Sequence, residues 1–87
     1  MAELIHEYSF VYRSDDGTPY VIRAWGESRH DGTWEGWLGF TPAGDTAGIG
    51  RELRTGQETT QPNRDAVAYW AGGLEPVYFE GAFARAS

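Results

Sequence analysis

The chain has 87 residues, of which 40 % are hydrophobic and 15 % aromatic, and a formal net charge of −6 from 13 acidic residues and 7 arginines, without lysine or cysteine. A chain this short buries only about 60–65 % of its unfolded surface, so we expect one small domain over residues 1–87, with a core dominated by aromatic side chains. The acidic balance disfavours nucleic acid and anionic lipid as partners. The absence of cysteine and lysine excludes disulfides, thiolate sites and Schiff-base chemistry.

Targeting, metal and cofactor signals are missing from the sequence. No apolar stretch approaches the roughly 20 residues of a membrane span, and no signal-peptide pattern opens the chain. His6 and His30 lie far apart without metal-ligand spacing, and the glycines form no phosphate-binding motif. We therefore expect a cytoplasmic protein with no membrane association, no metal and no cofactor.

Two similar turns organise the first half. The sequences SDDGT (14–18) and RHDGT (29–33) both contain Asp-Gly-Thr between alternating runs. A three-residue hairpin loop with glycine in the left-handed third position fits each of them. A two-residue Asp-Gly turn is the alternative, but in the second hairpin it would place Arg23 beside Phe40 and mix charge into the core. The pattern favours three-residue loops.

These loops predict the register of a three-stranded meander. Tyr12 pairs with Tyr20 and Ile22 with Phe40, so the strand around 20–28 is central. One face would then contain the predicted core residues Leu4, Tyr8, Phe10, Tyr12, Tyr20, Ile22, Ala24, Trp34, Leu38 and Phe40, with Phe10 opposite Ile22, Tyr8 opposite Ala24, and Ala24 opposite Leu38. The other face would contain Glu7, Ser9, Val11, Arg23, Trp25, Glu27, Glu35 and Trp37.

The second half predicts a helix followed by a strand. After a Gly-rich loop that follows Pro42, a short fourth strand is expected at 50–55. Pro62 indicates the first turn of a helix, capped by Gln61 or Thr60. The apolar residues at 67, 70, 71 and 74 form one stripe, and the glycines at 72 and 73 end the helix. Alternation of apolar residues at 77, 79 and 83 predicts a final strand at 77–84.

The predicted fold class is α+β in two layers. It consists of an antiparallel meander of about four strands, one short helix packed on one face, and a C-terminal strand, in the order ββββαβ.

Several motifs recur in an order that resembles a known group of proteins. They are WEGW (34–37), ETTQP (58–62), YWAGGL (69–74) and VYFEGA (77–82). Over residues 20–86 the chain resembles a family of small uncharacterised bacterial proteins that share these motifs. The resemblance implies a bacterial source and brings no established activity.

The paired tryptophans are the first candidate site. Trp25 and Trp37 lie side by side on the face away from the helix, with Arg23, Glu27 and Glu35 around them. An apolar patch with a polar rim is typical of a protein contact surface. The structural alternative is that both indoles cover their neighbours and stabilise the sheet.

Glu27 and Glu35 also form a like-charge pair across two strands. Two close carboxylates can divide acid and base roles between them. Arg23 and Arg29 can neutralise them, however, and a solvated lattice of salt bridges is the favoured interpretation.

A second candidate site precedes the helix. Arg54, Glu58, Thr60 and Gln61 belong to a polar run that could bind an anion at a helix N-terminus. The structural alternative, which we favour, is a capping network that anchors this segment. Glu80 is expected to pair with Arg51 or Arg54.

Three functional hypotheses follow from these features. The favoured one is a non-enzymatic interaction or regulatory module that binds a protein partner, or another copy of itself, through an open aromatic sheet face. The alternative is a small-ligand-binding domain with a shallow site lined by tryptophan and arginine. An enzyme is disfavoured because nucleophile, metal and cofactor motifs are missing.

Overall fold

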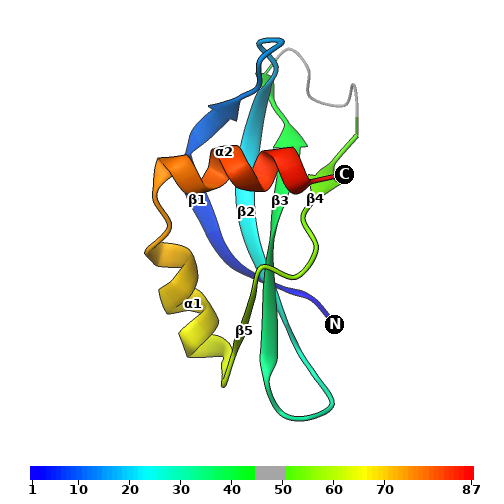
Figure 1. Ribbon diagram of the computed structural model, residues 1–87, viewed down its shortest axis with the longest axis vertical. Coiled ribbons are helices and arrows are strands. Elements are labelled where there is room, and N and C mark those ends of the chain that lie inside the picture. The colour runs from blue at the N-terminus through cyan, green and yellow to red at the C-terminus, as the bar shows by residue number, and fades with distance from the viewer. Residues whose placement is uncertain (45–50) are drawn as a thin grey trace.

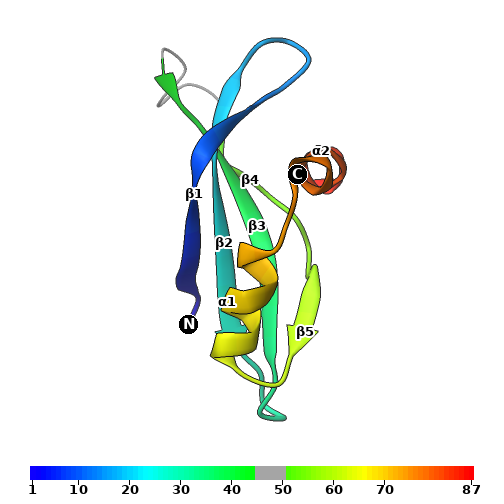
Figure 2. The same cartoon turned by 90° about the vertical axis from the view of Figure 1, so that its left-hand side faces the viewer.

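The computed structural model describes residues 1–44 and 51–87 as an antiparallel sheet with two helices on one of its faces (Figures 1 and 2). The strands run in the order β1-β2-β3-β4, and β5 also pairs with β3. The predicted two-layer α+β class is therefore confirmed. The elements are β1 (Glu3–Arg13), β2 (Pro19–Ser28), β3 (Trp34–Pro42), β4 (Leu53–Arg54), β5 (Thr59–Gln61), α1 (Arg64–Gly72) and α2 (Pro76–Arg85).

Both hairpins turn through the predicted three-residue loops. Gly17 and Gly32 have φ angles of +88° and +87°, a region that side chains other than glycine rarely adopt. In each loop the preceding aspartate, Asp16 or Asp31, accepts a hydrogen bond of 3.0 Å from the backbone N–H two residues later. This side-chain bond fixes the turn, and the turn fixes the register.

The register between β2 and β3 agrees with the prediction along its whole length. Ile22 lies opposite Phe40, and Trp25 lies opposite Trp37. The strand β2 is central, between β1 and β3.

The register of β1 departs from the prediction because the strand is interrupted twice. Tyr12 lies opposite Tyr20 as expected, but irregularities follow between Glu7 and Val11 and between Leu4 and His6. A bulge changes which face the later side chains occupy. As a result His6, and not Tyr8, lies opposite Ala24.

Two predicted core positions change as a consequence. Leu4 lies opposite Trp25 and is exposed, so its placement in the core was wrong, and Ile5 packs against the core instead. Phe10 stays in ring contact with Phe79 but is exposed on its other side.

The core lies between the sheet and both helices. Its buried members are Tyr8, Ile22, Ala24, Leu38 and Phe40 from the sheet, Ala71 from α1, and Phe79 and Ala82 from α2. The Tyr8 hydroxyl donates a 2.7 Å hydrogen bond to the Ala71 carbonyl. Burial raises the pKa of Tyr8 to about 12, so this donor keeps its proton and joins β1 to α1.

The helix α1 begins later than predicted. Asn63 caps it by accepting a 2.9 Å hydrogen bond from the Ala66 N–H, whereas the predicted caps Thr60 and Gln61 both lie in β5. The short strand β5 was predicted as a polar connection. The helix ends at Gly72, as expected, and its predicted apolar stripe packs on the sheet with Val67 and Ala71 buried.

The C-terminal segment is a helix and not the predicted strand at 77–84. Pro76 lies in the first turn of this helix. A backbone N–H there would have no helical acceptor, so proline costs no hydrogen bond. Phe79, Ala82 and Phe83 repeat at helical spacing and pack on the core. Glu80 is exposed as a result and forms no ion pair with Arg51 or Arg54 among the described residues.

The fourth strand is shorter than predicted, since β4 contains only Leu53 and Arg54. Its backbone also bonds to the chain end, because Arg54 and Ser87 exchange two N–H to O=C hydrogen bonds of 3.3 and 3.1 Å. Most of the Gly-rich loop and the start of the predicted strand, at 45–50, lie outside the described residues.

The close approach of α1 to β3 predicts a specific cost for one added methyl group. A Cβ at Gly36 would lie 3.0 Å from Thr59 Cγ2, 3.1 Å from Val67 Cγ1 and 3.3 Å from Trp70 Cζ3. We expect Gly36→Ala to lower the free energy of unfolding by about 1–3 kcal/mol through overpacking, measured by denaturant titration.

The matched control is Gly72→Ala at the end of α1, where an added Cβ meets no atom within 4 Å. That change should be neutral or stabilising by up to about 1 kcal/mol. If both variants unfolded at the same denaturant concentration, the close packing of α1 on β3 would be contradicted.

Candidate functional site: the uncovered face of the sheet

Within residues 1–44 and 51–87, both helices lie on one side of the sheet and leave its opposite face without a covering layer (Figure 2). Side chains alternate between the two faces along β2. Ile22 and Ala24 are buried under the helices, so Arg23, Trp25 and Glu27 lie on the opposite face. Their β3 neighbours on the same face are Glu35, Trp37 and Gly39, directly opposite in register. The sequence therefore placed the candidate residues on the correct face.

Trp37 is not open to solvent, although an exposed pair was predicted. Only 4 % of its surface is accessible. The Arg54 guanidinium lies over the Trp37 ring at 4.3 Å from its centroid, a distance at which cation–π attraction operates. Arg54 comes from β4, opposite Gly39, and it converts Trp37 into a structural residue.

Trp25 is half-buried and lies against Gly39. A Cβ at Gly39 would come within 3.1 Å of Trp25 Nε1, so any larger residue there would crowd the indole. Around it is a shallow groove of about 320 Å³, lined by Ala2, Trp25, Trp37, Gly39, Glu52 and Arg54.

Apolar side chains extend this surface towards the β1 edge. Leu4, opposite Trp25, is 44 % exposed, and Val11, opposite Val21, is 49 % exposed. Since β2 and β3 also contribute charged side chains, apolar and charged side chains are interspersed on this face.

The charged residues on the face occur in pairs. Glu7 Oε1 lies 2.8 Å from Arg23 Nε. Glu27 Oε2 lies 2.9 Å from the Met1 amino group, and Glu35 Oε2 lies 3.5 Å from an Arg29 nitrogen. Glu27 and Glu35 are neighbours in register, but each has its own cation. These pairs agree with the salt-bridge interpretation and do not support an acid–base dyad, but Arg23 was expected to neutralise this carboxylate pair and bonds to Glu7 instead.

The second predicted group does not form one site. Arg54 stacks on Trp37, whereas Glu58 lies beneath α2. The Thr60 hydroxyl accepts a hydrogen bond from the Gln57 amide, and the Gln61 amide donates one to Thr59 at 2.7 Å. Because these contacts are local and Asn63 caps α1, the anchoring interpretation is favoured over an anion site.

Glu58 is the residue of this group whose side chain is buried in a charged hydrogen-bond network. Its side chain is 8 % exposed and accepts hydrogen bonds from the Tyr78 hydroxyl and from Arg85 Nη2, both at 2.5 Å. Gly81 leaves space for Arg85 to fold back, since an added Cβ would lie 3.3 Å from its guanidinium. The network fastens α2 to the segment between β4 and β5.

The protonation of Glu58 follows from these contacts. Burial alone would raise the pKa of Glu58, but the hydrogen bonds from Arg85 and Tyr78 and the Arg85 charge outweigh it, so the pKa lies below its usual value. Burial and the Glu58 carboxylate raise the pKa of Tyr78 to about 12. Glu58 is therefore an ionised acceptor at neutral pH, and Tyr78 a protonated donor.

This network predicts a stability term that depends on pH. We expect Glu58→Gln to cost about 1–3 kcal/mol at pH 7, because the amide removes the negative charge that Arg85 and Tyr78 bond to and replaces one acceptor oxygen with a donor. A carboxyl whose folded pKa lies below its unfolded value stabilises above the unfolded pKa, about 4.3, and loses that contribution as pH falls through the folded pKa. The difference between variant and parent, measured by urea unfolding, should therefore shrink at acidic pH.

The control is Glu75→Gln, which removes the same charge at the exposed N-cap of α2, where the side chain makes no capping hydrogen bond. Its effect should stay within about 0.5 kcal/mol. A cost for Glu58→Gln that is as small as the control, or that persists undiminished at pH 3, would contradict the role of the ionised carboxylate.

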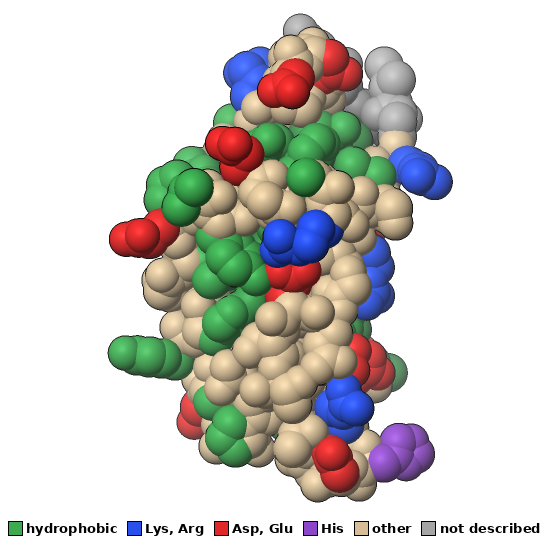
Figure 3. Space-filling view, viewed as in Figure 1, with side chains coloured by type: hydrophobic (Ala, Val, Ile, Leu, Met, Phe, Trp, Pro, Cys, Tyr) green, Lys and Arg blue, Asp and Glu red, His purple; other side chains and the backbone are tan. Residues whose placement is uncertain are grey.

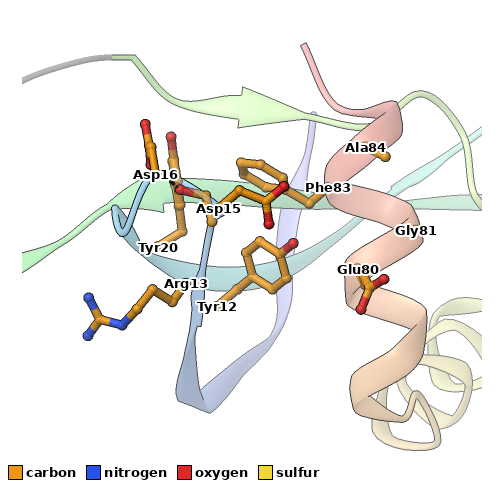
Figure 4. A pocket seen from close by; sticks show the side chains of 10 residues that line it. Tyr12, Arg13, Asp15, Asp16, Tyr20, Glu80, Gly81, Phe83 and Ala84 are labelled. Atoms are coloured by element: carbon orange, nitrogen blue, oxygen red, sulfur yellow. Dashed lines mark hydrogen bonds between the residues drawn. The ribbon is translucent and has the colours of Figure 1, made fainter.

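A further hollow, which the sequence did not indicate, lies between the β1–β2 turn and α2 (Figure 4). Its volume is about 850 Å³. It was missed because its wall is the segment predicted as a strand; the helical spacing of Phe79, Ala82 and Phe83 was the available signal.

Comparisons with known proteins give no identification: no family model, no curated protein and no solved structure matches the chain. The motif resemblance to small bacterial proteins therefore stays a hypothesis. No helix within residues 1–44 and 51–87 has the length and apolar character to cross a membrane. The same residues contain no group of three or more acidic, histidine or cysteine side chains suited to a metal ion.

Proposed function

We propose that this protein is a non-enzymatic protein-interaction module that binds a second copy of itself through the uncovered sheet face. The observation that carries the proposal is the line Arg23, Trp25, Glu27 along β2, in which a cation, an indole and a carboxylate follow one another on one face. If a second copy is placed with this order reversed about Trp25, the cation of each copy faces the carboxylate of the other.

The charge of the face supports a contact between two identical acidic chains. Its cations are Arg23, Arg29 and Arg54, and its carboxylates are Glu7, Glu27, Glu35 and Glu52. Three positive and four negative side chains give −1, against −6 for the chain. Two copies that meet elsewhere bring like charges together, whereas here repulsion is nearly absent.

A two-fold axis that passes over Trp25, across the strand direction, gives the geometry. Such an axis places Arg23 of one copy against Glu27 of the other and repeats the contact by symmetry. It also sets Leu4 against Leu4 beside the two indoles. Aromatic residues and arginine at the centre, with charges at the rim, are typical of contact surfaces.

The alternative, a small-ligand site in the groove beside Trp25, is less well supported. The groove of about 320 Å³ is at the lower limit of ligand pockets, and its arginine, Arg54, already stacks on Trp37. The cytoplasmic location indicated by the sequence stays part of the proposal, and the acidic charge supports a protein rather than nucleic acid as partner.

The mass of the protein in solution tests the proposal. We expect sedimentation velocity to give a concentration-dependent dimer, and Trp25→Ser to give a monomer with an unchanged circular dichroism spectrum. The matched control is Tyr69→Ser, since Tyr69 is 87 % exposed on α1, on the other side of the sheet. A parent protein that stays monomeric at millimolar concentration would overturn the proposal.

A charge exchange tests the symmetry itself. Glu27→Arg alone should weaken the dimer, because Arg23 of the second copy then meets a cation. Adding Arg23→Glu restores opposite charges across the axis, so the double variant should recover part of the lost association, measured by the same method. If the double variant associated no more tightly than Glu27→Arg alone, these residues would not meet across a two-fold axis.

A further inference from the structure

The cleft between the β1–β2 turn and α2 has an aromatic floor. The Phe83 ring of α2 lies 4.8 Å from the Tyr12 ring and 5.0 Å from the Tyr20 ring. Figure 4 shows the tyrosines entering from the hairpin and Phe83 from the helix. The volume of about 850 Å³ is within the range of small-ligand sites.

Two carboxylates without partners line the cleft on opposite sides of the aromatic floor. Asp15 belongs to the turn and Glu80 to α2, and both line the cleft. Neither forms a hydrogen bond or ion pair with another described residue. Asp16 differs, because it is held by the Ser14 hydroxyl at 2.5 Å and the Thr18 N–H at 3.0 Å and serves the turn.

Arg13 also lines the cleft, but it forms no ion pair with either carboxylate. Arg13 donates a 2.8 Å hydrogen bond to the Gly17 carbonyl, and in Figure 4 its guanidinium points away from α2. Figure 3 shows acidic side chains at the hairpin end of this face, directly above a hydrophobic area. The cleft is thus aromatic and negative, since Asp15, Asp16 and Glu80 line it against a single cation, Arg13, which pairs with neither Asp15 nor Glu80.

We infer that this cleft binds an organic cation, an ammonium or guanidinium group on an apolar stem. Ring faces attract a cation through their quadrupole, and the free carboxylates of Asp15 and Glu80 supply hydrogen-bond acceptors from both walls. An anion would be repelled, and a neutral apolar molecule would leave both carboxylates unpaired. The pKa of Tyr12 is raised by burial and then by the negative charges of Glu80 and Asp15, so both carboxylates act electrostatically on the aromatic floor.

The cation can come from a free amine or from an arginine side chain of a peptide, and the two sources are separable. The probes are 1,4-diaminobutane, N-acetyl-arginine methylamide and, as the uncharged analogue of the first, 1,4-butanediol. In a nuclear magnetic resonance titration both cations should shift the ring signals of Tyr12, Tyr20 and Phe83 with saturation, and the diol should not. The tighter of the two cationic probes identifies the source.

Variants connect the binding to the two carboxylates. Asp15→Asn and Glu80→Gln should each weaken diamine binding about two- to fivefold, as expected for exposed charge pairs. Glu75→Gln removes one charge from the same helix without lining the cleft and should change binding less than twofold. Because both carboxylates are at the surface, the fold should not depend on them.

Two outcomes would overturn the inference. One is equal weakening by all three variants, which would mean that the cations respond only to the net charge of the chain. The other is that the diol shifts the three ring signals as strongly as the diamine. Since the cleft is on the helix side, neither outcome bears on self-association through the opposite face.

Discussion

The left-handed glycines Gly17 and Gly32 decide which side chains of the central strand face the helices. Each closes a three-residue loop, and a shift of one residue in either loop would exchange the two faces of β2. Ile22 and Ala24 would then reach solvent, and Trp25 would have to enter the core. The division of the sheet into a packed face and an uncovered face therefore rests on two residues that have no side chain and contribute nothing to the core.

The parts of the fold that could be predicted are those in which turn chemistry and alternation agree. This is the case for β2 and β3, whose register follows the sequence throughout. It fails for β1, because a bulge has no distinct residue signal, and for α2, because Phe79 and Phe83 satisfy both a strand and a helix period. Pro76 decides for the helix: it suits a first turn, and Ala82 completes the helical stripe.

The sequence predicted on which face of the sheet the candidate residues lie, but not which of them are exposed to solvent. Alternation alone places Trp25 and Trp37 together, and it is correct about both. Whether an indole is exposed to solvent depends on a side chain from another segment, here Arg54, which reaches the Trp37 ring from β4. The same is true of Glu58, whose partners Tyr78 and Arg85 come from a helix that the sequence did not reveal. Local sequence patterns do not predict such contacts between segments that are distant in the chain.

The charge distribution relates the two proposed surfaces to each other. The uncovered face is almost neutral, so most of the −6 charge lies on the hairpin turns and the helix side. If two neutral faces associate, the acidic clefts beside Asp15 and Glu80 point outwards in opposite directions from one dimer. The two-fold axis across the strands also puts the two hairpin ends at opposite ends of the dimer, so one ligand does not engage both clefts and gains no avidity. Self-association at one face would therefore leave cation binding at each cleft independent.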